Sequence, residues 1–319
     1  MQKPRVFASA GNGWAACPTG ARHALCAGGR QGSGRGLGLA DQHREIAGEI
    51  RVAGHFGELL QGRIGEAGPV ALVTLPCPAR GLSCAWRPGG FALHGLGPRA
   101  LTPAAARALL RHARLPPRGA FRLRGDLPPG CGAGASTAAR VALLRAAARA
   151  AGLPPPPPET LAALCLASEG ATDPLMFPEP ARLLWGSRAG RGLATLPAPP
   201  AFAVLGGFLG APRRTDPADT AFPDIADLAR AWPAACADPA AAARLASESA
   251  RRTLALRHAG EADPTEALAR RLGALGFAIA HTGSARALLF APGTAPPGAK
   301  AALRAAGLTG ITAFATGRA

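Results

Sequence analysis

A short glycine-rich segment is the part of this sequence best suited to chemistry. Between residues 128 and 137, glycine recurs at alternate positions as Gly130, Gly132 and Gly134, and two hydroxyl residues, Ser136 and Thr137, follow at once. Because glycine carries no side chain, the backbone N–H groups of such a loop can approach phosphate oxygens closely. A helix predicted over residues 136–151 would direct the positive end of its dipole at the same anion. The pattern indicates a phosphate-binding loop, with a plain glycine-rich turn capped by Ser136 as the alternative.

Two common nucleotide-binding patterns are absent around this loop. The segment has no Gly-Lys-Ser/Thr tripeptide, and no ribose-binding acid follows the glycines at an interval of about 20 residues. A hydroxyl in the first turn of the helix can nevertheless ligate Mg²⁺, as a Ser or Thr does in P-loop enzymes. One of the two hydroxyls is therefore a candidate metal ligand.

Two carboxylates farther along the chain are candidates for the remaining chemistry. Asp173 lies between a predicted helix and the proline-rich residues 174–180. A carboxylate beside a reacting hydroxyl can accept its proton, whereas an Asx turn or a helix cap is the structural alternative. Glu169 offers the hard oxygens that Mg²⁺ prefers, or it could orient a substrate ammonium group or cap a helix. The residues alone leave these alternatives open.

The elements that must position these residues follow from the pattern of apolar residues. Helices and strands alternate along the chain, which predicts an α+β fold with helices packed on one face of a mainly antiparallel sheet. Predicted strands cover residues 50–53, 68–75, a pair within 81–93, 121–124, 202–209, 276–281, 286–290 and 310–315. Predicted helices cover residues 102–113, 136–151, 159–168, 224–231, 239–258, 265–275 and 298–306.

The first 46 residues differ from the rest of the chain. They contain nine glycines and no apolar periodicity, so they cannot bury enough surface to order themselves. We expect residues 1–46 to be a disordered or spurious extension. The remaining length predicts two domains, residues 47–195 and residues 196–319.

Composition limits the classes of function. Apolar residues make up 48% and charged residues 17% of the 319, which is typical of a globular protein. The net charge of +17 comes almost entirely from arginine, with lysine only at Lys3 and Lys300, and the arginines are scattered, never in a run of five or six. A GC-rich coding sequence produces this pattern whatever the function, so we expect no nucleic-acid partner. An electropositive cleft for an anionic ligand remains compatible with it.

Seven cysteines without a C-x-x-C pair argue against both a disulfide framework and a zinc site. The sequence has no apolar stretch that predicts a membrane span or a secretory signal. We therefore expect a cytoplasmic protein without a membrane partner. The sequence leaves a homodimer open.

Four motifs together resemble one enzyme superfamily. Residues 128–139 resemble the P-x-G-x-G-L-G-S-S-A-A loop of the galactokinase, homoserine kinase, mevalonate kinase and phosphomevalonate kinase (GHMP) superfamily. Residues 54–62 resemble the C-G-E-L-I-Q-G segment of its L-threonine kinases of the propanediol-utilisation and cobalamin type. Residues 279–284 resemble the A-H-S-G-T motif of those kinases, and residues 169–174 resemble their E-P-T-D-S with one residue inserted. The four motifs occur in the same order and span residues 49–291.

The resemblance implies a fold and an activity. The fold would be the two-domain GHMP architecture, with a ribosomal-protein-S5-like N-terminal domain and a ferredoxin-like C-terminal domain. The activity would be transfer of the γ-phosphoryl group of ATP to L-threonine, giving O-phospho-L-threonine for cobalamin biosynthesis. It implies Asp173 as the catalytic carboxylate, Ser136 and Glu169 as Mg²⁺ ligands, and two sets of binding residues. ATP would be bound by Pro128, Gly130, Cys131, Gly132, Ala133, Gly134, Ala135, Ser136 and Thr137, and the substrate by His55, Glu58, Gln61, His281, Thr282 and Gly283.

Two departures from the motif concern the loop. The first of the two loop serines is Ala135 here, and the lysine that the threonine kinases carry in the loop is Cys131. These changes leave other readings open. The chain could be another GHMP alcohol kinase, acting on homoserine or an isoprenoid precursor, or a degenerate kinase that binds nucleotide without catalysis.

Overall fold

The computed structural model describes residues 49–95, 100–257 and 262–317, which lie within one compact unit of the chain, residues 45–319. The hypothesis that residues 1–46 are a disordered or spurious extension lies outside the described residues.

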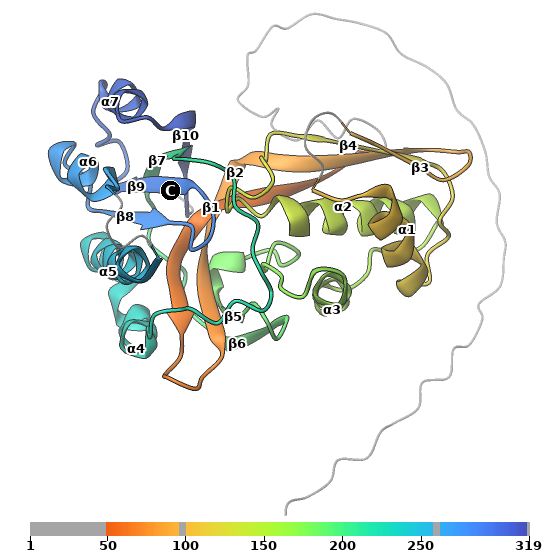
Figure 1. Cartoon of the computed structure of the whole chain (residues 1–319), viewed down its shortest axis with the longest axis horizontal. Helices are drawn as coiled ribbons and strands as arrows, with labels where there is room; N and C mark the ends of the chain where they lie inside the picture. Colours follow the sequence, from red (N-terminus) through yellow and green to blue (C-terminus); the bar gives the residue numbers. More distant parts are fainter. Residues whose placement is uncertain (1–48, 96–99, 258–261, 318–319) are drawn as a thin grey trace, which may run out of the picture. The chain divides into compact units, whose positions relative to one another are not determined.

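Ten strands of the described residues form one mixed sheet in the order β10-β7-β9-β8-β1-β2-β4-β3, with β5 and β6 attached at β2 (Figure 1). Only β3 and β4 pair in parallel; the other ladders are antiparallel. This confirms the predicted α+β class. The strands are β1 (Glu49–Arg63), β2 (Val70–Arg87), β3 (Ala92–Gly95), β4 (Ala120–Gly125), β5 (Leu183–Gly186), β6 (Arg191–Thr195), β7 (Ala203–Phe208), β8 (Gly276–Ile279), β9 (Ala285–Phe290) and β10 (Thr309–Ala315).

Helices α1 to α3 lie beside the β1–β4 part of the sheet, and α5 and α6 lie near β8 and β9 (Figure 1). Helix α4 packs on α5 and β1. Helix α2 packs on β1 and β2, whereas α5 packs on β1 and β8. The helices are α1 (Pro103–His112), α2 (Ala135–Ala150), α3 (Pro158–Glu169), α4 (Ala226–Ala235), α5 (Pro239–Arg257), α6 (Thr265–Arg271) and α7 (Ala299–Ala305), with a 3₁₀ turn, η1 (Pro180–Arg182).

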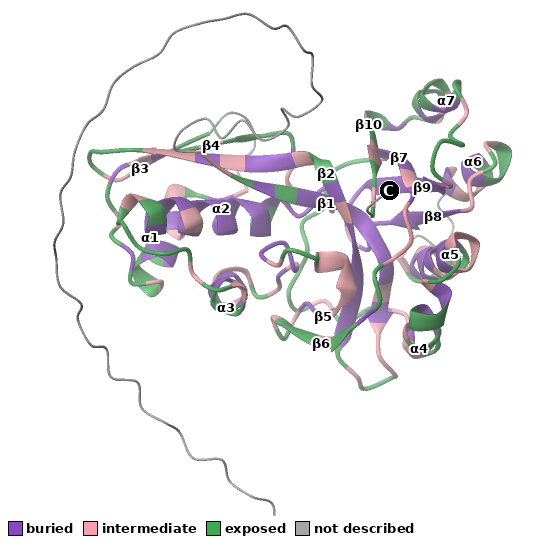
Figure 2. Cartoon of the chain, turned by 180° about the vertical axis from the view of Figure 1, so that it is seen from behind, coloured by how far each residue is buried: buried purple, intermediate pink, exposed green. Residues whose placement is uncertain are grey.

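Helix α2 is buried on most of its surface, as the purple ribbon in Figure 2 shows. Its sequence is rich in alanine, and residues such as Ala138, Ala142 and Leu143 are fully buried. A helix that is apolar nearly all round belongs in a core. Its N-terminus, which carries the predicted phosphate loop, is therefore held rigidly by the surrounding sheet and helices.

Within residues 81–93 the two predicted strands and the break between them are confirmed, but their pairing with each other is wrong. Residues 81–87 continue β2, and β4 lies between β2 and β3, so the two segments do not pair with each other. Strand β2 stays continuous past Pro78 because its register with β1 shifts there: Ala53 faces Gly81, whereas Gly54 faces Cys77. A bulge of this kind accommodates a proline that cannot donate to the ladder. Strands β5 and β6 were not predicted, because their residues lack alternation.

Strand β1 joins the two halves of the sheet, since it pairs with β2 along most of its length and with β8 through Glu58 and Ile279. The predicted domain boundary at residues 195 and 196 falls between β6 and β7. It stays a prediction.

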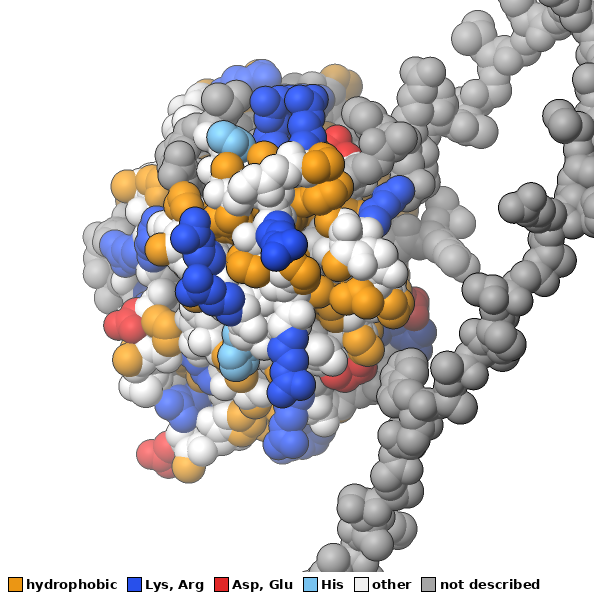
Figure 3. All heavy atoms as spheres, turned by 90° about the vertical axis from the view of Figure 1, so that its right-hand side faces the viewer, with side chains coloured by type: hydrophobic (Ala, Val, Ile, Leu, Met, Phe, Trp, Pro, Cys, Tyr) orange, Lys and Arg blue, Asp and Glu red, His pale blue; other side chains and the backbone are white. Residues whose placement is uncertain are grey.

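The surface carries its positive charge in separate groups. On the face shown in Figure 3, apolar and uncharged side chains stand between the groups of basic side chains. The expected absence of a nucleic-acid partner stays a prediction. Among the described residues, every helix is too short or too polar to cross a lipid bilayer.

Candidate active site

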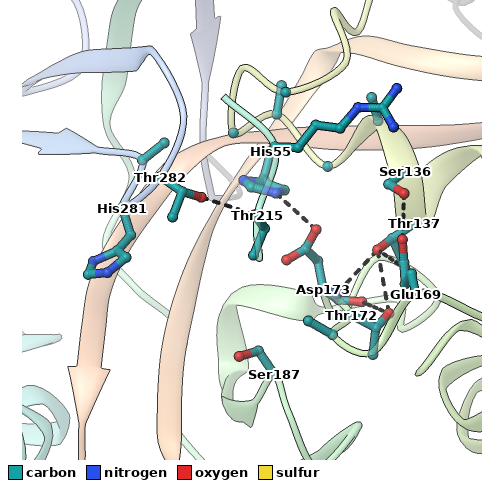
Figure 4. Close-up of a pocket in the computed structure, with 18 of the residues that line it drawn as sticks. His55, Ser136, Thr137, Glu169, Thr172, Asp173, Ser187, Thr215, His281 and Thr282 are labelled. Carbon is teal, nitrogen blue, oxygen red and sulfur yellow. Dashed lines mark hydrogen bonds and ion pairs between the residues drawn. The ribbon is translucent and has the colours of Figure 1, made fainter. Parts of the chain in front are cut away.

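A cavity of about 320 Å³ lies where the glycine-rich loop meets β1, the segment after α3 and the turn between β8 and β9. Figure 4 shows that its wall brings together side chains far apart in the sequence, among them His55, Ser136 and Asp173. Residues 213–215 line it from the long connection after β7.

The loop adopts the conformation that its glycines allow. Gly130, Gly132 and Gly134 have φ values of +78°, +69° and +74°, which residues with a side chain adopt at a cost. A Cβ atom on Gly132 would lie 2.2 Å from Cβ of Ala280, so the turn after β8 also requires glycine here.

Backbone hydrogen bonds hold the loop against β1. The carbonyl of Gly132 accepts from Gly57 N at 3.2 Å, and that of Ala133 accepts from His55 N at 3.2 Å. In a trans peptide the C=O and the following N–H point in opposite directions. The N–H groups of Ala133 and Gly134 therefore turn away from β1, and both residues line the cavity. This arrangement suits an anion at the loop.

Helix α2 begins immediately after the loop. Gly134 is its N-cap, with no side-chain hydrogen bond to the first turn. Ser136 therefore does not cap the helix, in contrast to the structural alternative that the sequence left open. The N–H groups of the first turn and the positive end of the helix dipole face the cavity.

Ser136 instead belongs to a cluster with α3. Its Oγ donates to Glu169 Oε2 at 2.5 Å and accepts from Arg140 Nη1 at 2.6 Å, while Arg140 Nη1 lies 3.2 Å from the same carboxylate oxygen. Thr137 Oγ1 donates to Glu169 Oε1 at 2.8 Å. Burial raises the pKa of Glu169, against the opposing effect of the Arg140 charge. The cluster is thus a carboxylate, two hydroxyls and a guanidinium at the start of α2.

This cluster fits a magnesium ion. Mg²⁺ binds oxygen at about 2.1 Å in an octahedron, so two adjacent ligands lie about 3 Å apart. Ser136 Oγ and the Glu169 carboxylate already lie at nearly that separation, and both line the cavity. Arg140 stands beside them and would add a second positive charge near the phosphates. The predicted ligands Ser136 and Glu169 are therefore suitable donors in a suitable arrangement.

A second cluster joins β1 to the segment after α3. His55 Nε2 lies 3.3 Å from Asp173 Oδ2, and His55 Nδ1 lies 3.2 Å from Glu58 Oε1. The pKa of His55 is raised to about 9: burial opposes the imidazolium, but the charges of Glu58 and Asp173 outweigh it. Burial raises the pKa of Glu58 to about 8, with His55 acting in the opposite sense.

The same three residues have the geometry of a metal site, since one potential ligand atom of each lies within 4.8 Å of the others. A histidine binds metal only as the neutral ring. His55 lies between the two carboxyl groups, whose charges raise its pKa and favour the protonated ring.

A bulge in β1 explains how His55 and Glu58 share one side of the strand. Side chains alternate along a regular strand, so residues three apart point to opposite faces. The register of β1 with β2 shifts between His55 and Glu58, and Gly57 has a φ of +76°. A Cβ on Gly57 would also lie 2.8 Å from the carbonyl carbon of Ile279. Gly57 is therefore required for both the bulge and the close approach of β8.

Asp173 is positioned by its backbone and by His55. Its N–H donates to Thr137 Oγ1 at 3.3 Å, and Thr137 also bonds Glu169. The preceding Thr172 is fixed by Trp185 Nε1, which donates to its carbonyl at 2.7 Å. Thr137 thus links the Glu169 carboxylate to the backbone of Asp173. The Asp173 side chain is 26% exposed and lines the cavity.

The far side of the cavity is formed by His281 and its neighbours. The ring of Phe222 stacks on His281 with centroids 3.9 Å apart and planes at 6°. Burial, followed by the charge of Arg257, lowers the pKa of His281 to about 3, so the ring is neutral. Thr282 Oγ1 lies 3.0 Å from Thr215 Oγ1. This agrees with the expectation that His281 and Thr282 line the cleft, and gives His281 no catalytic role.

Most of the predicted site residues line this cavity. Three do not: Pro128, Cys131 and Gly283 are absent from its wall. Cys131 is 4% exposed, and its carbonyl accepts from Ala285 N at 2.9 Å. Gly283 lies against the loop backbone, where a Cβ would meet Gly132 N at 2.3 Å. The predicted residues on the wall are His55, Glu58, Gln61, Gly130, Gly132, Ala133, Gly134, Ala135, Ser136, Thr137, Glu169, Asp173, His281 and Thr282.

The sequence analysis missed several residues of the wall. Arg140 follows Ser136 by four positions, which places both on one face of a helix, so that spacing could have identified it. Arg188, Thr215 and Phe222 lie in connections between elements, where no periodicity marks them.

Comparison with known proteins gives the fold. Residues 100–177 match the family model of the GHMP kinases N terminal domain. Among solved structures, the mevalonate kinase of Methanococcus jannaschii is 11% identical with a TM-score of 0.59, over 86% of this chain and 98% of that chain. A putative homoserine kinase from Listeria monocytogenes is 18% identical with a TM-score of 0.56, over 84% of this chain and 94% of that one. A 4-(cytidine 5'-diphospho)-2C-methyl-D-erythritol kinase is 22% identical with a TM-score of 0.53, over 85% and 100% of the two chains.

A search of curated proteins finds no match to the sequence. The match over residues 100–177 covers the loop, α2, α3 and Asp173, which form part of the cavity wall. The structural likeness extends over both halves of the sheet. The chain therefore has the GHMP kinase fold, and its residues 100–177 are similar to the N-terminal domain of those kinases.

Proposed function

We propose that this protein is an ATP-dependent kinase that phosphorylates the hydroxyl group of a small molecule, most specifically L-threonine. The observation that carries the proposal is the position of Asp173. Its carboxylate faces the same cavity as Ser136 and Glu169, and Thr137 joins the two parts through hydrogen bonds. Phosphoryl transfer requires a bound triphosphate, neutralised charge and an oriented hydroxyl, and one cavity offers a place for each.

In this mechanism the loop binds the phosphates of ATP through its backbone N–H groups and the start of α2. Ser136 and Glu169 would hold Mg²⁺, which neutralises phosphate charge when bound. Arg140 lies beside them and adds a guanidinium to the same region. The loop has the buried Cys131 where the threonine kinases carry a lysine. In this mechanism Arg140 supplies the positive charge instead of that lysine.

Asp173 orients the hydroxyl of the acceptor and accepts its proton. The acceptor oxygen forms a bond to the γ-phosphorus, the bond from that phosphorus to the β,γ-bridging oxygen breaks, and ADP leaves. His55 keeps its proton and holds the Asp173 carboxylate in place. Glu58 and the bulge at Gly57 in turn fix the position of His55.

The choice of L-threonine rests on the motifs at residues 54–62 and 279–284, which resemble those of L-threonine kinases. In agreement with an amino-acid acceptor, Glu58 Oε2 and Gln61 Oε1 are buried without a hydrogen-bond partner among the described residues. Both line the cavity as acceptors for an ammonium group. The product would be O-phospho-L-threonine, and a role in cobalamin biosynthesis would follow from that substrate.

The test is an assay with ATP, MgCl₂ and a panel of acceptors that includes L-threonine, L-homoserine, L-serine and mevalonate. ADP release is measured, and the phosphorylated product is identified by ³¹P NMR. We expect turnover with L-threonine above the rate of ATP hydrolysis alone. Turnover with another alcohol only would support the kinase function but show that L-threonine is not the acceptor. Clear ATP binding without turnover of any acceptor would identify a degenerate, nucleotide-binding protein.

A further inference from the structure

Arg188, Arg213 and Arg214 are the arginines of the cavity wall that the proposed chemistry leaves unused, and Arg188 is the one whose Nε is buried without a partner among the described residues. It lies in the tight turn between β5 and β6, where Ala189 N and Gly190 N both donate to Gly186 O, at 3.0 and 2.8 Å. The turn follows Ser187, which also lines the cavity (Figure 4). The turn therefore holds the guanidinium close to the place where the acceptor would bind.

The hydrogen-bonding groups of Arg188 are only partly satisfied. Its Nη2 donates to the carbonyl of Asp216 at 3.0 Å, whereas its Nε is buried without a partner among the described residues. A buried N–H without an acceptor destabilises a folded protein unless a ligand satisfies it. Beside Nε–H, a guanidinium has four further N–H donors on its two Nη atoms, in a planar fork that matches a carboxylate.

The acidic groups near Arg188 are engaged elsewhere. The carboxylates whose charges act on the pKa of Arg188 are Asp219, Asp173 and Asp216, and the charge of Arg257 acts in the opposite sense. Asp219 pairs with Arg257, Asp173 contacts His55, and Asp216 Oδ1 accepts from Ala218 N at 2.9 Å. The ring of Phe222 lies 5.8 Å from the Arg188 guanidinium. Arg188 therefore has cationic and aromatic neighbours, while each of the three nearby carboxylates contacts another group.

Because of its position in the cavity, we expect Arg188 to contact the acceptor rather than ATP. Its neighbours are residues 216–222 and Arg257, whereas the phosphate loop has its own cation in Arg140. Asp173, the proposed reacting carboxylate, is near both regions of the cavity. Its charge acts on Arg188, and its N–H donates to Thr137 at the start of α2.

We propose that Arg188 binds a carboxylate of the acceptor, so that the enzyme selects hydroxy acids over simple alcohols. This inference rests on the proposed kinase function. His55 does not supply the donor for this carboxylate, because both of its ring nitrogens contact other groups. The acceptor would place its hydroxyl at Asp173, its carboxylate at Arg188 and an ammonium group at Glu58 and Gln61.

The test compares acceptors that differ only in the carboxylate. L-Threonine is paired with 1-aminopropan-2-ol, and L-homoserine with 3-aminopropan-1-ol. Each pair is assayed with the native chain, Arg188→Gln and Arg188→Lys. Arg191→Gln is the matched control, since Arg191 begins β6 on the exposed surface and does not line the cavity.

We expect Arg188→Gln to lower kcat/KM for the carboxylate acceptors by about 100-fold, because a buried bidentate contact is lost. The decarboxylated partners should change less than about 3-fold, and KM for ATP should not move, since neither contact is removed. Arg188→Lys should fall between, because it keeps the charge without the fork. Melting temperatures of all variants are measured in parallel.

An equal loss with both members of a pair, or a rise in KM for ATP alone, would overturn the inference and assign Arg188 to the phosphates or to folding. If the native chain binds ATP but turns over no acceptor, the kinase proposal fails. Calorimetry then decides the inference separately: L-threonine binding that needs Arg188 supports it, and binding that Arg188→Gln leaves unchanged contradicts it.

Discussion

His55 Nε2 lies 3.3 Å from Asp173 Oδ2, and this contact connects a strand at the centre of the sheet to the carboxylate that faces the proposed reaction. The histidine is buried, while the Asp173 side chain is 26% exposed at the cavity. A protonated imidazole therefore restrains an acid that substrate can reach. We therefore propose that His55 positions Asp173 and that Asp173 accepts the proton of the acceptor hydroxyl.

Replacing Asp173 with Asn should separate catalysis from binding. We expect turnover to fall by about two to four powers of ten, the usual range for a positioned proton acceptor, which corresponds to about 3–5 kcal/mol of transition-state stabilisation. ATP affinity should change only a few-fold, because the proposed contacts of the loop with the phosphates do not involve Asp173. Asp216→Asn is the control, since its side chain does not line the cavity. Unchanged turnover in Asp173→Asn would leave Asp173 a turn residue only.

Replacing Ser136 with Ala should abolish most activity while the protein still folds. The hydroxyl does not cap α2, so its loss removes hydrogen bonds to Glu169 and Arg140, worth about 1–2 kcal/mol. Its loss as a metal ligand should reduce turnover far more and raise the Mg²⁺ concentration needed. Ser168→Ala is the matched control, because Ser168 also bonds Arg140 but lies outside the cavity wall. Parallel losses of stability and activity in both variants would indicate a structural hydroxyl.

Replacing Arg140 with Gln should weaken phosphoryl transfer by about 100-fold, the cost of removing one preorganised donor from a transition state. Arg140→Lys should recover part of the activity, because the charge is kept. The affinity for ATP should fall more than that for ADP if the guanidinium acts at the terminal phosphate. Arg145→Gln is the control: Arg145 lies on the same helix and donates to Met176 O, away from the cavity. Equal losses of ATP and ADP affinity would argue against that contact.

Raising the pH from 6 to 9 should lower the free energy of unfolding. Folded His55 keeps its proton to about pH 9, whereas an unfolded histidine loses it near 6.5, so the folded state binds more protons in between. Folded Glu58 likewise stays protonated to about pH 8, while an unfolded glutamate ionises near 4.5. Both groups therefore make the free energy of unfolding fall as the pH rises. His55 does so between pH 6.5 and 9, and Glu58 between pH 4.5 and 8.

Urea denaturation at several pH values checks this dependence. His55→Gln should flatten the decline between pH 6.5 and 9, and Glu58→Gln the decline between pH 4.5 and 8. The same slope in the native chain and in both variants would contradict the assigned protonation states.

Replacing Gly57 with Ala should destabilise the chain more than replacing Gly65. Both glycines have positive φ, at +76° and +82°, so each alanine costs about 1–2 kcal/mol for the backbone conformation. Only at Gly57 would the new Cβ clash, 2.8 Å from the carbonyl carbon of Ile279, whereas Gly65 has open space around it. Urea denaturation measures both. Equal effects would show that the β1 bulge adapts to the extra atom.

The sequence by itself determined most of the helices and strands and the glycine-rich loop. The alternating glycines, the hydroxyls after them and the alanine-rich helix predicted the loop and α2 within one residue of where they begin and end. Thr102 and Pro103 likewise predicted the start of α1, where Thr102 Oγ1 accepts from Ala105 N. Such features are local, since caps and glycine conformations depend on neighbours in the chain.

Only the tertiary structure decided how these residues combine. The bulge at Gly57 turns His55 and Glu58 to one side, and the contact of β1 with the loop brings both to Asp173. Arg140 and Arg188 join the wall from a helix and a turn without any motif that relates them. Their proximity depends on which strands pair and in which register, and a one-residue change of register reverses the direction of every side chain. That pairing is set by packing across the whole sheet, which no local pattern contains.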